Sequence, residues 1–199
     1  MVFGLFRRKK TNQRIVAAIY ERLTAISRHP ALYETMGAPD TVMGRFEMIA
    51  AHMVIFFRRT GQGGPAVRDL AQEIVDAFFE DIDHSIREIG IGDMGVPKRM
   101  KKFARMFYGR YESYAKAIDA GDREALRAAL ARNIYPPQRD GSANREARDV
   151  SALADYLIAR AADLQSVTDE EILAGRIALR PPAVDVDTKV QEIGTAGGR

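Results

Sequence analysis

The sequence predicts an all-α protein: a single irregular bundle of about six to eight helices with no sheet. Apolar residues recur every three or four positions along almost the whole chain, which is the spacing of one helix face. No stretch shows the sustained alternation of apolar and polar residues that marks a strand between hairpin turns. At 199 residues, the chain can bury roughly 70% of its unfolded surface, so one core forms without disulfides or a structural metal.

The first predicted helix should end near His29-Pro30, because the residue before a proline is pushed out of the helical region. Its apolar face consists of Ile15, Ile19, Leu23 and Ile26. The short segment ALYETMG (31–37) should form a second helical piece before a turn at Gly37–Asp40.

A third helix should follow this turn, with Asp40 or Thr41 as its N-cap. Its predicted inner face consists of Val42, Phe46, Ile49, Met53 and Phe56. The second half of this helix is apolar on both sides, so we expect the helix to be central in the bundle. The stretch RRTGQGGP (58–65) should be a flexible connection.

Two long helices of opposite charge are predicted next. Pro65 suits the first turn of one with an apolar stripe at Val67, Leu70, Ile74, Phe78, Ile82, Ile86 and Ile89. Its outer surface is acidic, through Asp69, Glu73, Asp76, Glu80, Asp81, Asp83 and Glu88. After a glycine-rich turn at 90–95, the next helix has a heptad-like stripe at Met100, Phe103, Phe107, Tyr111, Tyr114 and Ile118.

Three more helices complete the prediction. Gly121 should end the basic helix and Asp122 should cap the next, whose apolar edge is Leu126, Leu130 and Ile134 and which Pro136-Pro137 terminates. A polar loop (138–146) leads to a helix marked by Val150, Leu153, Leu157, Ala161 and Leu164. Thr168 and Glu171 have the spacing of a capping box. We therefore expect an N-terminal segment (1–11), a helical domain (12–178) and a flexible C-terminal tail (179–199).

Composition excludes several classes of protein. With no cysteine, the chain has no thiolate metal site, iron–sulfur cluster or cysteine nucleophile. The longest nearly apolar run (48–57) is far shorter than the roughly 20 residues of a membrane-spanning helix, and no secretory signal is evident. We expect a cytoplasmic protein. The N-terminal MVFGLFRRKK joins a small apolar wedge to four bases, which fits either peripheral membrane attachment or a simple frayed end.

No catalytic or cofactor site is expected. Glu80, Asp81 and His84 share one helix surface and could contribute to a metal site, but a di-iron bundle needs further carboxylates and a second Glu-x-x-His motif. A solvated acidic face is the alternative. A helical metal- or lipid-dependent enzyme built on these three residues therefore stays as a competing interpretation, although no nucleophile elbow or phosphate-binding loop accompanies it.

The most informative cluster is basic. Four residues line one edge of the second long helix, the fifth predicted helix of the chain, at i, i+3, i+4 and i+7: Lys98, Lys101, Lys102 and Arg105. Arg99 lies beside them. These residues are candidate partner-binding residues. They could instead be solvated or paired with the acidic helix, or bind ribosomal RNA, anionic lipid headgroups or an acidic protein. Because the net charge is only +3, we rank an RNA partner below an acidic protein partner, and DNA is not expected as a partner.

Three blocks resemble the ubiquinol-cytochrome c chaperone family over roughly residues 15–164: GAPDTVMGRFEMIAAHMVIFFRR (37–59), AFFEDIDHSIREIGIGDMGVPKRMKKFARMFYGRYESY (77–114) and RNIYP (132–136). The second block is the most specific of the three. The residues that match the family pattern there are Asp81, Asp83, Arg87, Glu88, Gly90, Gly92, Asp93, Val96, Pro97, Lys98, Lys101, Phe107, Tyr108, Gly109 and Arg110.

The resemblance implies a non-enzymatic, all-α assembly chaperone for the cytochrome bc1 complex, with newly made cytochrome b or another bc1 subunit as client. It further implies a small helical co-chaperone and contact with the ribosome or an anionic membrane surface. The chain lacks the long targeting extension of mitochondrial members, so we expect a bacterial member acting at the cytoplasmic face of the inner membrane. Under this interpretation Lys98, Arg99, Lys101, Lys102 and Arg105 form a docking edge, while Asp81, Asp83, Arg87 and Glu88 brace the neighbouring turn or face a partner.

Overall fold

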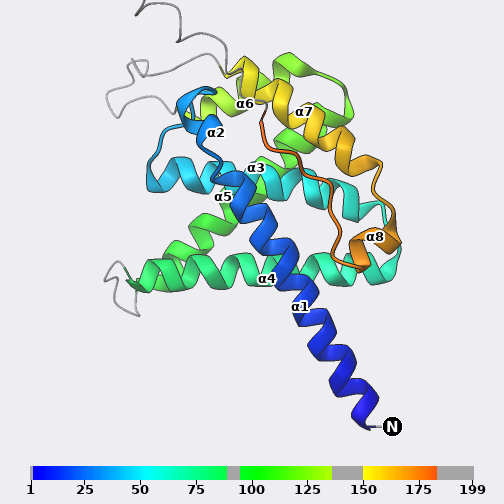
Figure 1. The fold of residues 1–199 in the computed structure, drawn as a ribbon. Helices are drawn as coiled ribbons and strands as arrows, with labels where there is room; N and C mark the ends of the chain where they lie inside the picture. Colours follow the sequence, from blue (N-terminus) through cyan, green and yellow to red (C-terminus); the bar gives the residue numbers. More distant parts are fainter. Residues whose placement is uncertain (1, 89–94, 136–149, 183–199) are drawn as a thin grey trace, which may run out of the picture.

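A computed structural model describes residues 2–88, 95–135 and 150–182, with side chains from residue 12 onward. These residues form eight helices and no strand, which confirms the predicted all-α fold (Figure 1). The helices are α1 (Val2–Ser27), α2 (Pro30–Glu34), α3 (Val42–Gly61), α4 (Pro65–Glu88), α5 (Val96–Asp119), α6 (Arg123–Ile134), α7 (Ser151–Gln165) and α8 (Asp169–Leu173).

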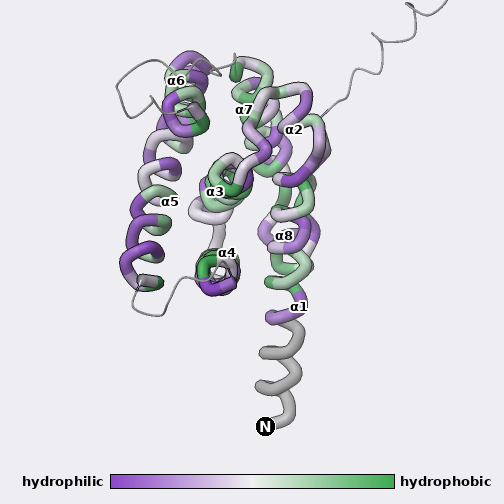
Figure 2. The backbone as a smooth tube through the Cα atoms, turned by 90° about the vertical axis from the view of Figure 1, so that its left-hand side faces the viewer, coloured by the Kyte–Doolittle hydropathy of each residue, from purple (hydrophilic) through white to green (hydrophobic). Residues whose placement is uncertain are grey.

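Helix α3 is the centre of the bundle, as predicted. Figure 2 shows it nearly end-on, with α4 beneath it, α5 on one side and α1 on the other. It also contacts α6 and α7. Its middle is buried all round because both of its faces are apolar, through Met48, Met53, Val54, Ile55 and Phe56.

The start of α3 depends on a close backbone approach. Thr41 is the N-cap, and its Oγ1 accepts a hydrogen bond from the Gly44 N–H at 3.0 Å. The preceding turn folds back onto this point with Gly37 at a φ of +81°. A Cβ on Gly44 would lie only 1.9 Å from the Pro39 carbonyl oxygen. Only glycine therefore fits at position 44.

The connection predicted at residues 58–65 is shorter than expected, so this prediction was wrong. Helix α3 continues to Gly61, which leaves residues 62–64 as the connection. The reason is Arg59, which is only 8% exposed and donates to the Val167 carbonyl oxygen and to Asp169 Oδ1 (2.8 Å). Asp169 Oδ2 also accepts from the Gly64 N–H at 2.7 Å. These bonds hold both the end of α3 and the connection against α8.

Other local predictions are confirmed. Helix α4 begins at Pro65, Gly121 ends α5 with a φ of +64°, and the Asp122 side chain caps α6. Thr168 and Glu171 form both bonds of the capping box. Core burial continues past residue 178, because Leu179 is buried. The features predicted at residues 89–94, 136–149 and 183–199 lie outside the described residues.

One predicted core residue is not in the core. Val42 is 77% exposed and its neighbour Met43 is 42% exposed, although Phe46 one turn later is buried. The apolar face of α3 therefore extends beyond the bundle at its N-terminal end.

Among the helices in the described ranges, none has an apolar stretch that could span a bilayer.

His52 lies fully buried in α3, and among the described residues it belongs to no group of side chains that could hold a metal ion. Its Nδ1 donates to the Met48 carbonyl oxygen (2.7 Å), which leaves Nε2 to accept from the Tyr156 hydroxyl on α7 (3.0 Å). The pKa of His52 is lowered from 6.5 to about 4, mainly by burial and to a smaller extent by the positive charge of Arg160, while the bond to Met48 opposes the shift. The imidazole is thus neutral in the folded chain at neutral pH.

We predict that the free energy of unfolding falls as the pH is lowered from about 6.5 to about 4. Only the unfolded chain takes up the His52 proton in this range, so the shift contributes about 3 kcal/mol at pH 7 that is lost towards pH 4. Urea unfolding at several pH values measures it. In His52→Gln this part of the pH slope should be absent, and equal slopes in both proteins would contradict the assignment.

Gly44→Ala should destabilise the chain by about 1–3 kcal/mol, since the added methyl group collides with the Pro39 carbonyl oxygen. Gly109→Ala is the matched control, because a Cβ at this position inside α5 meets nothing within 4 Å. The control should be neutral or stabilising. Chemical denaturation compares the two, and equal stability of both variants would contradict the close approach.

Candidate functional site

The basic edge of α5 consists of Lys98, Arg99, Lys101, Lys102 and Arg105. All five side chains are exposed. None of them forms a hydrogen bond or ion pair with any side chain that the structure describes. None of the five therefore forms an ion pair with the described acidic side chains of α4, which was one of the open alternatives.

Several acidic side chains of α4 have other partners. Asp81 Oδ2 accepts a hydrogen bond from the Tyr20 hydroxyl at 2.8 Å, which ties α4 to α1. Burial and this carboxylate both raise the pKa of Tyr20. Asp83 pairs with Arg87 one turn away, at 2.7 Å. These contacts brace α4 itself. The turn they were expected to support (90–94) lies outside the described residues, so that role stays a prediction.

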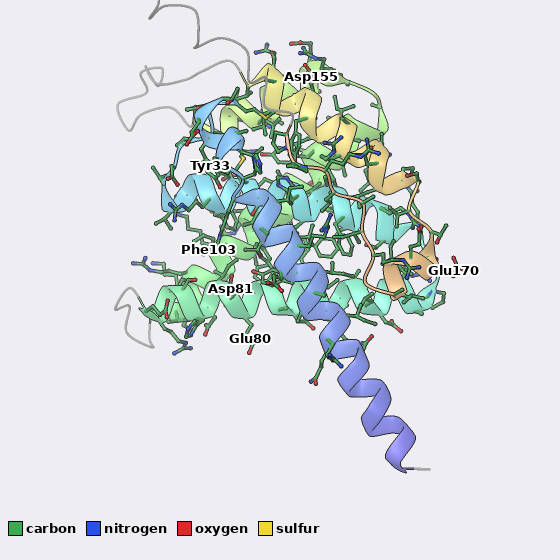
Figure 3. All side chains as sticks on the ribbon, viewed as in Figure 1. Tyr33, Glu80, Asp81, Phe103, Asp155 and Glu170 are labelled. Carbon is green, nitrogen blue, oxygen red and sulfur yellow. The ribbon has the colours of Figure 1, made fainter. Side chains whose placement is uncertain are left out.

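Glu80, Asp81 and His84 do not come together as a metal site. Figure 3 shows Glu80 pointing away from the bundle, while Asp81 bonds to Tyr20. His84 Nε2 lies 3.1 Å from Glu88, and both of these side chains are exposed. Within the described ranges, no three histidine, aspartate or glutamate side chains gather where they could hold a metal ion.

An apolar pocket lies beside these residues, between α1, α3, α4 and α5. Its volume is about 490 Å³, within the range of ligand-binding clefts. Its apolar walls are formed by Phe46, Ile49, Phe78, Ile82, Ile86 and Phe103. Asp81 and Phe103, labelled in Figure 3, line it from α4 and α5. We call this hollow the apolar pocket.

A second hollow of about 810 Å³ continues from the apolar pocket along α5. The two share Met43, Arg99 and Phe103. The second is lined by apolar Met43, Phe103 and Met106, by Gly95, and by the cations Lys98, Arg99, Lys102 and Arg105. We call it the basic groove. Four of the five predicted docking residues therefore line one concave surface, and Lys101 lies outside it.

A buried ion pair sets the position of this surface. Glu47 of α3 is only 3% exposed, and its carboxylate accepts from Arg110 Nε at 2.8 Å and from Arg110 Nη2. Burial raises the pKa of the Glu47 carboxyl, although Arg110 opposes the shift. The guanidinium of Arg110 also lies over the Phe46 ring. Phe46 in turn packs edge-on against Phe103, with ring centroids 4.9 Å apart. The pair therefore holds α5 where Phe103 forms the floor of both hollows.

Sequence reasoning did not single out Glu47, Ile49 or Met43 as parts of a site. The signal for Glu47 was present, because it is an isolated carboxylate in a helix predicted to be central. A charge in that position needs a buried partner.

Comparison with known proteins identifies the family. Residues 34–179 match the family described as Ubiquinol-cytochrome C chaperone. The chain belongs to this family. "Ubiquinol-cytochrome-c reductase complex assembly factor 1" of Xenopus laevis is 27% identical over 150 residues, which cover 75% of this chain and 72% of that protein. The Mus musculus protein of the same description is 25% identical over 144 residues, 72% of this chain and 47% of that protein.

A solved structure, "Crystal structure of the Cbp3 homolog from Brucella abortus", is 45% identical to this member of the ubiquinol-cytochrome C chaperone family. The two superpose with a TM-score of 0.77, over 90% of this chain and 97% of that one. The chain is thus a chaperone and not an enzyme, as expected. The family match contains α3–α8, so it includes every wall of the two hollows except α1.

We predict that Arg110→Ala lowers the free energy of unfolding by about 3–5 kcal/mol, because it leaves the Glu47 carboxylate buried without a partner. Arg45→Ala is the matched control. Its ion pair with Asp40 is 61% and 60% exposed, so water screens it and its loss should cost far less than the loss of Arg110. Chemical denaturation measures both, and a similar small cost for the two variants would contradict a structural role of the Glu47–Arg110 pair.

Proposed function

We propose that this chain is an assembly chaperone for the ubiquinol-cytochrome c reductase (cytochrome bc1) complex, and that its client is newly made cytochrome b. Family membership and the names of the relatives support the first statement. The observation that carries the second is the surface on α5: a row of exposed cations without ion-pair partners in the described structure, beside an apolar pocket.

Such a surface suits transient capture of a membrane protein. The exposed cations attract an anionic partner over about the Debye length, and the pocket then shields apolar residues of the client from water. Because neither step makes a covalent bond, the client is released when it binds its final partners.

The proposed place of action is the cytoplasmic face of the inner membrane. There the basic edge also faces anionic lipid headgroups, each basic residue contributing about 1 kcal/mol to surface attraction. A small helical co-chaperone and the ribosome are further proposed partners. The N-terminal MVFGLFRRKK combines apolar residues with bases, which supports a second contact with the membrane surface.

Lys101→Glu combined with Lys102→Glu should lower the amount of mature bc1 complex in cells, since it reverses two charges of the docking edge. Helical circular dichroism and the melting temperature should not change, because both side chains are exposed. The matched control is Lys116→Glu with Arg176→Glu, two exposed cations away from the edge. Native gels of the membranes compare the variants.

A normal bc1 level in the Lys101 and Lys102 variant would remove the docking edge from the proposal. The same exposed cations also fit the phosphates of ribosomal RNA, which is the competing function. That function requires binding to ribosomes that weakens steeply with added salt as counterions are released. Normal bc1 levels together with such binding would favour the ribosome.

A further inference from the structure

The basic groove and the apolar pocket form one continuous surface that fits a specific kind of partner. We infer that it binds an amphipathic helix of a partner protein whose apolar stripe is flanked by acidic residues. This inference rests on the proposed function and deepens it, because it names the element that the chaperone recognises.

Exposed apolar side chains border the groove. Four large hydrophobic residues are exposed in the described structure, and two of them, Val42 and Met43, lie in the first turn of α3 beside the groove. Met43 of α3 lines both hollows, and Met106 lines the groove from α5, the helix that also carries the cations. An exposed apolar patch bordered by polar residues marks an interaction site. Methionine side chains are flexible enough to fit partners of varied shape.

The described charges of the groove are all of one sign. Lys98, Arg99, Lys102 and Arg105 line the basic groove, and none of the described residues that line it is acidic. These cations have no ion-pair partner in the part of the chain that the structure describes. At the other end, two carboxylates line the apolar pocket. Asp81 is held by Tyr20, and Glu88 lies 3.1 Å from His84 Nε2. A partner that neutralises the free charges must therefore carry carboxylates next to its apolar residues.

The shape of the surface favours a helix over a lipid bilayer. The cations line a hollow whose wall also contains the apolar side chains Met43, Phe103 and Met106, whereas a flat bilayer would meet a flat or protruding basic face. A helix places side chains i, i+3, i+4 and i+7 in one stripe that extends about 10 Å, and such a stripe can fill a groove of this kind. The combined hollows, about 490 and 810 Å³, have room for several large side chains.

The test is direct binding of two designed peptides to the purified full chain. Each is an amphipathic helix of about 18 residues with a leucine stripe and one tryptophan. One has glutamates flanking the stripe, and the other has lysines at the same positions. The chain contains no tryptophan, so the peptide fluorescence reports binding without background. The acidic peptide should bind, and the basic peptide should not.

Two variants locate the binding. Met43→Glu places a carboxylate in the groove that the cations line. It should weaken binding of the acidic peptide about tenfold or more, which corresponds to about 1.4 kcal/mol. It should not unfold α3, because an acidic side chain in the first turn of a helix is favourable. The matched control is Leu173→Glu, an exposed hydrophobic residue on α8, which should bind the peptide normally.

Equal binding of both peptides, or equal affinity of Met43→Glu and the unchanged chain, would overturn the inference. Binding of anionic vesicles with neither peptide bound would overturn it in favour of lipid. Self-association that Met43→Glu abolishes, without peptide binding, would show a second copy as the occupant. The same experiments distinguish failure of this inference from failure of the proposed function. If the Lys101 and Lys102 variant lowers the bc1 level but the acidic peptide does not bind, only this inference is wrong.

Discussion

The structure depends on the burial of polar side chains in its central helix. Because α3 is enclosed by other helices, each polar side chain there must find a partner that water would otherwise supply. Glu47 pairs with Arg110 of α5, His52 bonds to Tyr156 of α7, and Arg59 bonds to the start of α8. Three directional contacts thus set where three other elements lie around one axis. Non-directional apolar packing alone would fix these positions less uniquely.

The same helix explains where the candidate site lies. Burial of α3 ends at its N-terminal turn, where the apolar face continues into solvent through Val42 and Met43. The Glu47–Arg110 pair is one turn further along and holds α5 beside this exposed face. The basic side chains of α5 therefore border an apolar surface that the bundle does not cover. This exposed continuation of the core is the surface that we propose captures another protein.

Local features of the fold could be predicted because their chemistry is local. Thr41, Asp122 and Thr168 cap helices through bonds to backbone only three residues away. The end of α3 was predicted wrongly because Arg59 bonds to a carbonyl 108 residues later in the chain. The sequence reveals the basic edge as a cluster of like charges, but it does not reveal which residues of other helices lie beside that edge. Met43 is brought to it from α3 by contacts between helices, which no spacing within one helix reveals.

The central claim is that the chain acts in the assembly of the bc1 complex. The most direct measurement is deletion of its gene, followed by absorbance spectra and native gels of the membranes. The account predicts selective loss of the b-type haem signal and of assembled bc1 complex, with other respiratory complexes intact and recovery when the unchanged gene is restored. Unchanged bc1 complex in the deletion strain would contradict the account.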